Sequence, residues 1–255
     1  MFIDTHTHIY LDHFKHDLAE VIERARSNGV LKLLLPNIDS ESIDSMFKVC
    51  EAYPETCSMM MGLHPTSVSE TWQADLDVVE KWLDEKDFIA VGEIGIDLYW
   101  DTTFRQEQME AFARQIQLAR DHDLPFVIHS RNSFDEVFEV LDRMKNGTYQ
   151  GIFHAFSGNE EQAIRAITLG FKLGIGGVVT YKNGGLDKTI EKIGMEHLVL
   201  ETDAPYLTPV PFRGKRNEPS YVRYIAEKIA LLLKQDVKLV EEITSRNAVE
   251  VFGIN

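Results

Sequence analysis

Two short apolar segments, Phe-Ile-Ala-Val-Gly-Glu-Ile (88–94) and Pro-Phe-Val-Ile-His-Ser (125–130), flank a helical pattern. In that pattern the apolar residues Phe112, Ile116 and Ala119 recur at the i, i+4 and i+7 positions of one helix face. A strand, an amphipathic helix and a second strand in this order are typical of a βαβ unit with parallel strands.

The same alternation runs along the whole chain. Strands are predicted at 2–7, 30–36, 57–63, 88–94, 125–130, 150–155, 171–176 and 197–203, and the clearest helices at about 17–28 and 104–121. No linker or low-complexity segment interrupts the alternation. It therefore predicts an α/β fold with a single domain over residues 1–255, and favours a closed (β/α)₈ TIM barrel over an open doubly wound sheet.

One long segment, residues 204–219, departs from this alternation. It holds four of the eight prolines of the chain together with a small basic cluster. Because proline lacks a backbone donor and fixes φ, we expect a long, stiff loop. The segment directly follows the last predicted strand, which places it over the barrel mouth, and helical patterns at about 219–235 and 238–251 follow it.

The formal net charge of −15 limits how the protein meets other molecules. A protein that holds nucleic acid with its whole surface is usually basic. If the substrate is an anion, the attraction must be local and come from metal ions and a few Lys and Arg side chains.

The chain gives no sign of a membrane protein. No window approaches 18 uninterrupted apolar residues, and the first residues lack the basic and apolar stretches of a signal peptide. Cys50 and Cys57 are the two cysteines, and we expect free thiols in a reducing cytoplasm. The predicted location is therefore cytoplasmic.

Titratable side chains end several of the predicted strands. His6 and His8 bracket Thr7, and side chains at i and i+2 of a strand point to the same face. The other candidates in such runs are Glu93, His129, His154 and Asp203. Burying such groups singly costs several kcal/mol unless they are paired or bind a metal. A shared metal site is therefore one interpretation of these residues, and separate core residues that each form their own hydrogen bonds are the alternative.

The C-terminal strand ends of a barrel are where its enzymes keep their chemistry. Histidines and carboxylates together suit Zn²⁺, Mn²⁺, Mg²⁺ or Fe²⁺, and a carboxylate such as Glu93 can bridge two ions. The sequence therefore predicts a metal site at the C-terminal mouth.

These motifs resemble those of the TatD-type metal-dependent deoxyribonucleases of the amidohydrolase-like superfamily, over essentially the whole chain. The resemblance rests on Ile-Asp-Thr-His-Thr-His (3–8), Gly-Leu-His-Pro (62–65), Gly-Glu-Ile-Gly-Ile-Asp (92–97), His-Ser-Arg (129–131), His-Ala-Phe-Ser-Gly (154–158), Leu-Glu-Thr-Asp-Ala-Pro-Tyr-Leu (200–207) and Arg-Asn-Glu-Pro (216–219). Two positions depart from the family pattern: Ile9-Tyr10-Leu11 delays the acid that follows the second histidine to Asp12, and Ala155 stands where cysteine is common.

The resemblance implies two or three divalent ions (Mg, Mn or Zn). The ligands of the first ion would be His6, His8, Glu93 and Asp203. A second ion would be held by His129 and His154 together with Glu93, which would bridge the two. Glu201 would help to bind a third ion.

Other residues at the predicted mouth have open roles. Asp203 is a ligand, or also the base that acts on a metal-bound water. Arg131 could clamp a phosphate or form a salt bridge, and His64 could contact a substrate phosphate or be a core histidine.

The loop after the last predicted strand supplies local positive charge through Arg213, Lys215 and Arg216. These residues could form an anion-binding site or simply a solvated face. Asn217 could donate to a phosphate oxygen, Glu218 could hold the loop, and Asp97 and Tyr99 could shape the rim or lie in a surface loop.

Three functions are consistent with these features. The first is a phosphodiesterase acting on DNA through metal-activated hydroxide, as a 3′→5′ exonuclease on single strands or frayed 3′ ends, with a role in DNA repair or in degradation during cell death as the resemblance implies. The second is a hydrolase of a small amide, lactone or phosphate ester on the same barrel. The third is a non-catalytic metal-binding or scaffold protein. The absence of one of the family's metal ligands would suggest it, but all of the expected ligands are present in this sequence. No GxGxxG or Walker pattern indicates a nucleotide cofactor.

Overall fold

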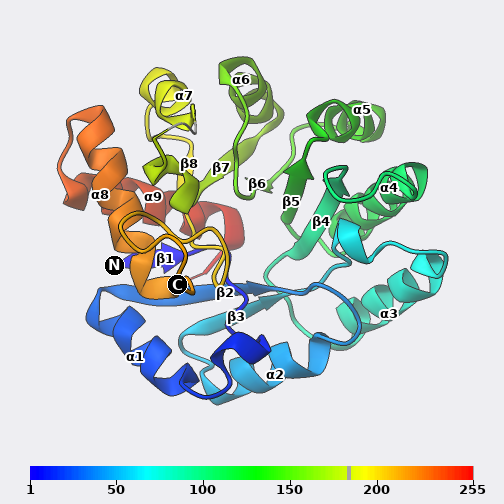
Figure 1. The fold of residues 1–255 in the computed structure, drawn as a ribbon. Coiled ribbons are helices and arrows are strands. Elements are labelled where there is room, and N and C mark those ends of the chain that lie inside the picture. The colour runs from blue at the N-terminus through cyan, green and yellow to red at the C-terminus, as the bar shows by residue number, and fades with distance from the viewer. Residues whose placement is uncertain (183–184, 255) are drawn as a thin grey trace.

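A computed structural model describes residues 1–182 and 185–254 of the protein, and the alternation of strands and helices runs through them (Figure 1). The strands are β1 (Phe2–Asp4), β2 (Val30–Pro36), β3 (Cys57–Met60), β4 (Val91–Asp97), β5 (Phe126–Arg131), β6 (Gly151–Phe153), β7 (Phe171–Ile175) and β8 (Leu198–Leu200). The helices are α1 (Leu18–Ser27), α2 (Ile43–Ala52), α3 (Trp72–Glu85), α4 (Arg105–Asp121), α5 (Phe134–Met144), α6 (Glu160–Leu169), α7 (Leu186–Ile193), α8 (Val222–Leu233) and α9 (Val237–Phe252).

The strands form two parallel sheets, β1-β2-β3 and β4-β5-β6-β7-β8. Backbone contacts join the two sheets at both seams. At one seam Thr7 bridges Ala204, and the Thr5 N–H donates to the Leu200 carbonyl at 3.0 Å. At the other, Met61 bridges Val91. The chain therefore has the predicted TIM-barrel architecture, and helices α1 to α8 surround the strands (Figure 1).

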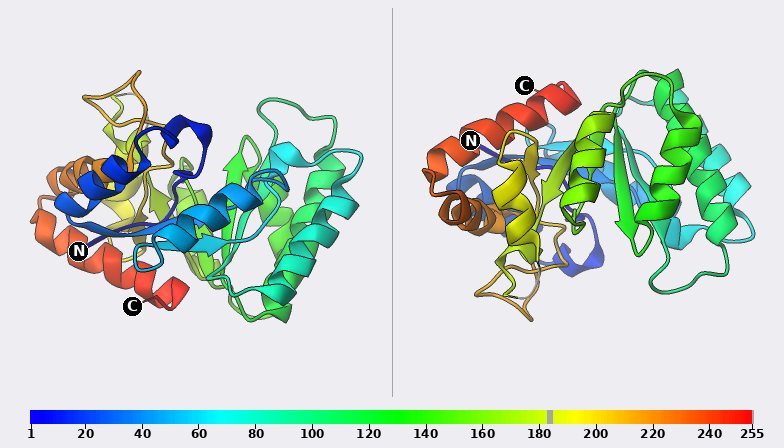
Figure 2. Two further views of the ribbon diagram at one scale, coloured as in Figure 1. Left: turned by 90° about the horizontal axis from the view of Figure 1, so that it is seen from below. Right: turned by 90° about the horizontal axis from the view of Figure 1, so that it is seen from above.

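One end of the barrel interior is filled and closed by apolar side chains. A buried cluster takes one residue from the strands or their immediate flanks around most of the barrel: Ile3, Leu34, Met60, Ala90, Val127, Ile152 and Val199. Ala248, Val251 and Phe252 of α9 complete this cluster. Helix α9 therefore covers the N-terminal ends of the strands, opposite to the long loop that follows β8 (Figure 2).

The predicted strands are all present, but their ends differ from the prediction. β1, β3 and β8 are shorter than predicted, so His6, His8 and Asp203 lie in the segments just after their strands. β4 spans 91–97 instead of the predicted 88–94, and Glu93 therefore lies inside it. The register with β5 continues to Asp97 because Gly95 lets the strands approach closely: a Cβ there would lie 2.1 Å from the His129 carbonyl oxygen.

The two clearest predicted helices are confirmed. α1 and α4 lie where predicted, and the Asn28-Gly29 stop has Gly29 at φ +80°. Cys50 and Cys57 are free and buried. Within the described residues no helix is long and apolar enough to span a membrane.

Candidate metal centre

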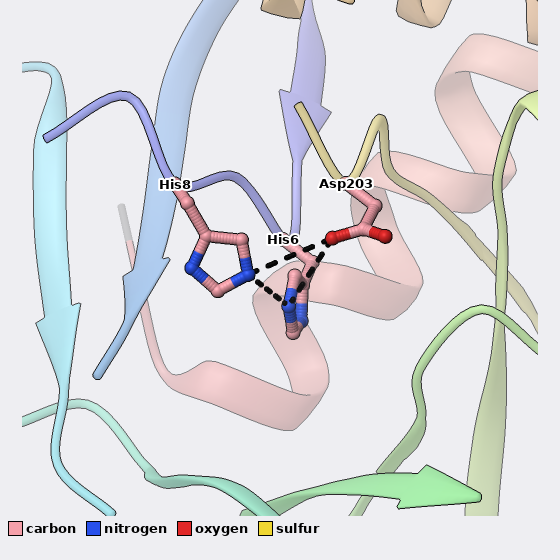
Figure 3. Close-up of side chains that lie close together, drawn as sticks. All are labelled: His6, His8 and Asp203. Carbon is pink, nitrogen blue, oxygen red and sulfur yellow. Dashed lines mark hydrogen bonds and ion pairs between the residues drawn. The ribbon is translucent and has the colours of Figure 1, made fainter. Parts of the chain in front are cut away.

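The side chains of His6, His8 and Asp203 converge at the mouth of the barrel (Figure 3). The two Nε2 atoms are 3.2 Å apart, and Asp203 Oδ1 lies 3.6 Å from His8 Nε2 and 3.9 Å from His6 Nε2. Two nitrogens on a tetrahedral ion with bonds of about 2.0 to 2.1 Å would be roughly 3.3 Å apart. The spacing of this group therefore suits one small divalent ion.

A buried network fixes Asp203 against the first strand. The Asp203 N–H donates to the His6 carbonyl at 2.9 Å. One residue earlier, the N–H and hydroxyl of Thr202 donate to the Asp4 carboxylate at 2.8 and 2.6 Å. Asp203 has φ +56°, a left-handed conformation that is uncommon for residues other than glycine. β1 and β8 therefore set the position of this carboxylate together.

Glu93 lies at the centre of the site. Its Oε2 is 3.0 Å from His6 Nε2, and its Oε1 is 2.8 Å from His129 Nδ1 and 3.4 Å from His154 Nε2. Burial would raise the pKa of Glu93, but the surrounding histidines outweigh burial and hold this pKa well below its usual value. Glu93 is therefore an ionised carboxylate between two histidine groups, the geometry that a bridging ligand needs.

Glu201 supports the far side of the site. Its Oε1 accepts the Ala155 N–H at 2.6 Å and lies 2.9 Å from His154 Nδ1. Its Oε2 is buried without a hydrogen-bond partner in the described structure. A Cβ on Gly174 would lie 2.1 Å from this oxygen, so only glycine leaves room for Glu201 here.

The stacked rings of His6 and His154, with centroids 3.5 Å apart, have opposite protonation preferences. Burial and the charge of His154 lower the pKa of His6 to about 4. Burial also lowers the pKa of His154, but the charges of Glu201 and Glu93 outweigh it and raise the value to about 10. The positive charge of the pair therefore lies on His154 and His6 is neutral, because two stacked buried cations would repel each other.

Two residues that orient the predicted ligands were missed or undervalued at the sequence level. The Tyr10 hydroxyl donates to the Pro36 carbonyl at 2.6 Å and lies 2.9 Å from His8 Nδ1. It therefore accepts a hydrogen bond from the Nδ1–H of His8, which leaves Nε2 without a proton and able to bind a metal. Asp97 is buried at the end of β4 rather than in a surface loop, and its Oδ2 is 2.9 Å from His129 Nε2. This contact turns His129 Nδ1 toward Glu93. The signal available in the sequence was a polar residue shortly after a predicted ligand: Tyr10 lies two residues after His8, and Asp97 four residues after Glu93.

The residues present fit a set of divalent ions. Three groups have ligand atoms within 4.8 Å of one another, and two of them share Glu93 with other histidines: His6, His8 and Asp203; His6, Glu93 and His154; His64, Glu93 and His129. Among the described residues no Lys or Arg forms an ion pair with Glu93, Glu201 or Asp203, so buried negative charge faces only imidazoles. The buried atoms His6 Nδ1 and Glu201 Oε2, which have no hydrogen-bond partner in the described structure, point to the same conclusion.

His64 lies beside the ligand groups. Its Nδ1 accepts the Thr66 N–H at 3.1 Å, which leaves the proton of the neutral ring on Nε2, 3.5 Å from Glu93 Oε1. Burial lowers the pKa of His64, consistent with a neutral ring. This arrangement favours the predicted role of a donor toward substrate over that of a ligand.

The structure corrects the interpretation of Asn217. Its side chain is fully buried and donates to the carbonyls of Thr202 and Tyr206 at 2.8 and 2.6 Å, while its Oδ1 accepts the Glu218 N–H. No donor remains for a phosphate. Asn217 instead fastens the long loop to the end of β8.

Arg216 is also engaged, with residues of the segment that precedes α1. Its guanidinium pairs with Asp17 at 2.6 and 2.8 Å, and stacks over the ring of Phe14. Glu218 holds the same region to α1 through Arg24, as expected. The salt bridge of Arg216 gives no support to the predicted phosphate contact.

Arg131 follows the predicted geometry more closely. It ends β5, two residues after His129, and is exposed at the mouth. Its guanidinium carbon lies 3.8 Å from the centroid of the Tyr99 ring, and no carboxylate of the described residues forms an ion pair with it. Its cationic edge is therefore available to an anion.

The family model described as TatD related DNase matches residues 3–253. The chain belongs to the TatD family. Within this family, the metal-dependent hydrolase YabD of Bacillus subtilis (strain 168) is 37% identical, with both chains covered completely. The 3′-5′ ssDNA/RNA exonuclease TatD of Pantoea ananatis (strain LMG 20103) is 31% identical over 94% of this chain and 95% of its own.

A crystal structure of the TatD homologue YjjV from Escherichia coli K12 superposes with a TM-score of 0.91 at 30% identity, covering 100% of this chain and 98% of YjjV. The TatD family relationship and the His and carboxylate groups at the mouth identify this chain as a metal-dependent hydrolase.

Proposed function

We propose that this TatD-family hydrolase cleaves phosphodiester bonds of DNA, as a 3′→5′ exonuclease acting on single strands. The observation that carries the proposal is the ionised Glu93, which lies within 4.0 Å of His6, His8, His129 and His154. Such a bridging carboxylate suits two-ion hydrolysis of a phosphate ester.

The proposed ligands of the ions are His6, His8, Glu93, His129, His154, Glu201 and Asp203. Bound divalent ions would lower the pKa of a coordinated water and neutralise charge on the phosphate; Mg, Mn and Zn all accept this donor set. Asp203 is the proposed proton acceptor. Burial would raise the pKa of its carboxyl, but the nearby histidines His8, His154 and His6 outweigh burial and hold this pKa below its usual value, so Asp203 is ionised at neutral pH.

Arg131 and His64 are the proposed substrate contacts. Arg131 offers a guanidinium to a non-bridging phosphate oxygen, and His64 donates from Nε2 at the wall of the site. The acidic surface, with a net charge of −15, suits a strand that enters by its end better than a duplex held along its length. The relative from Pantoea ananatis, whose printed name is a 3′-5′ ssDNA/RNA exonuclease, supports this substrate class.

The test is the digestion of a 5′-labelled single-stranded oligonucleotide by metal-stripped protein, with Mg²⁺, Mn²⁺ or Zn²⁺ added back. We expect a ladder that shortens stepwise from the 3′ end, and no ladder with Glu93→Gln. Glu85→Gln, an exposed residue at the end of α3, is the matched control and should retain the ladder.

Intact DNA under every metal would overturn the proposal, and hydrolysis of small amides, lactones or phosphate esters by the same protein would then favour the second function. Hydrolysis of RNA at the same rate would widen the substrate to both nucleic acids. The cytoplasmic location and the role in DNA repair stay predictions.

A further inference from the structure

Two aromatic side chains lie exposed beside the metal centre, on the segment that follows β4. Trp100 is 73% exposed and Tyr99 is 50% exposed. Most large apolar side chains of this protein are buried, because their exposure to water is unfavourable. A pair of exposed aromatic rings at the rim of an active site therefore indicates a binding surface. With the neighbouring Arg131, these residues form a surface that we call the stacking platform.

The parts of the stacking platform hold one another in place. The rings of Tyr99 and Trp100 meet edge to face, at 4.8 Å between centroids and 89° between planes. The guanidinium of Arg131 lies 3.8 Å from the Tyr99 centroid and 5.2 Å from the Trp100 centroid. Edge-to-face and cation–π contacts of this kind orient the rings before a ligand arrives.

The stacking platform is directly connected to the proposed ligands. The Tyr99 N–H donates to Asp97 Oδ1 at 2.9 Å, and the other oxygen of Asp97 contacts His129 Nε2 at 2.9 Å. Asp97 and Arg131 are paired in the β4–β5 register. One carboxylate therefore joins the aromatic rim to a metal-ligand histidine.

We propose that the stacking platform binds a nucleobase of the single-stranded substrate, next to the phosphate that the metal centre cleaves. This inference rests on the proposed function and adds the group that recognises the strand. The open face of Trp100 can take any base, because every base has a π face. The guanidinium of Arg131 beside it can pair with the adjoining phosphate. An apolar protein partner would not need such a positive charge, so the combination favours a nucleotide.

The experiment compares two labelled hexamers of equal charge with hydrolysis-resistant phosphorothioate linkages, one of thymidylate and one abasic. Binding to the metal-loaded protein is followed by fluorescence anisotropy. Wild type is expected to bind the thymidylate hexamer about tenfold more tightly than the abasic one, the effect of one stacked base. Trp100→Ala is expected to bind both hexamers equally, at the affinity of wild type for the abasic strand.

Leu231→Ala is the matched control, because Leu231 on α8 is also 73% exposed and lies away from the mouth. It should keep the tenfold preference. If Trp100→Ala keeps this preference while wild type cleaves DNA, the nucleobase inference is overturned and the proposed function stands. If wild type neither binds the hexamers nor cleaves DNA, the proposed function fails and the inference fails with it.

Discussion

At the scale of single residues, the site depends on the groups behind the ligands as much as on the ligands themselves. Tyr10 departs from the family pattern, which usually places an acid soon after the second histidine. Its hydroxyl nevertheless orients His8: because it donates to the Pro36 carbonyl, it accepts a hydrogen bond from the Nδ1–H of His8. The departure therefore leaves the ligand function of His8 intact.

Tyr10→Phe removes this hydroxyl and keeps the buried ring. We expect metal affinity to fall about 10- to 100-fold, the usual effect of losing a group that orients a ligand histidine. Competition with a chromophoric chelator measures the affinity. Tyr149→Phe is the control, since the Tyr149 hydroxyl also donates to a buried carbonyl, that of Leu141, away from the site. Equal affinities for Tyr10→Phe and the control would contradict the assigned role of Tyr10.

Metal uptake should release protons from His154. The raised pKa of His154, about 10, makes it an imidazolium at pH 8 in the metal-free protein, and a ligand histidine must be neutral. His6, with a pKa of about 4, is already neutral there. Since protons compete with the ion below pH 10, apparent affinity should rise at least about tenfold per pH unit between pH 7 and 9.

Calorimetric titrations in two buffers of different ionisation enthalpy count the protons released. Glu201→Gln removes the nearest negative charge, so it should lower the pKa of His154 and reduce the release. Binding heats that do not depend on the buffer would show that His154 is not a protonated ligand in the metal-free protein.

At the scale of elements, the sequence predicted the strands, whose positions follow from the pattern of hydrophobic residues. It missed the end of β4 and the role of Asn217, which depend on contacts with other parts of the chain. The eight strands are visible because each is a short apolar run that must be buried inside the ring of helices. The end of β4 was misplaced because Gly95 and Asp97 look like loop residues until β5 is set beside them. The buried role of Asn217 could not be predicted, since its partners belong to the backbone of a loop with no regular pattern.

Asn217→Ala should loosen the loop that follows β8. Asn217 donates to the carbonyls of Thr202 and Tyr206, which flank Asp203, so its loss should reduce kcat/KM at least about tenfold as well as stability by about 1 to 3 kcal/mol. Asn247→Ala is a close control: Asn247 is also buried and donates to two backbone carbonyls, near the start of β8.

Denaturant melts and steady-state kinetics on both variants separate the two effects. The control should lose similar stability and keep its activity in conditions where it remains folded. A similar loss of kcat/KM in both variants would mean that the loop does not position Asp203.

At the scale of the whole molecule, the charge distribution sets how a polyanion can approach. The protein carries a net charge of −15, and Arg216 near the mouth is already neutralised by Asp17. Arg131 lies beside the metal centre, and its guanidinium keeps an open edge. A DNA strand is therefore attracted locally at the mouth and repelled over most of the surface, in contrast to proteins that line a groove with basic residues.

This distribution predicts a weak dependence of DNA binding on salt. For a single strand the slope of log K against log [salt] is about −0.7 for each phosphate neutralised, so one to three contacts give a slope between about −0.7 and −2. Anisotropy titrations of a labelled single strand at increasing KCl measure this slope. Arg131→Gln should make it shallower by about 0.7. Arg246→Gln, an exposed residue of α9 at the closed end of the barrel, should leave it unchanged. A wild-type slope steeper than about −3 would require a longer basic track on the surface than the mouth provides.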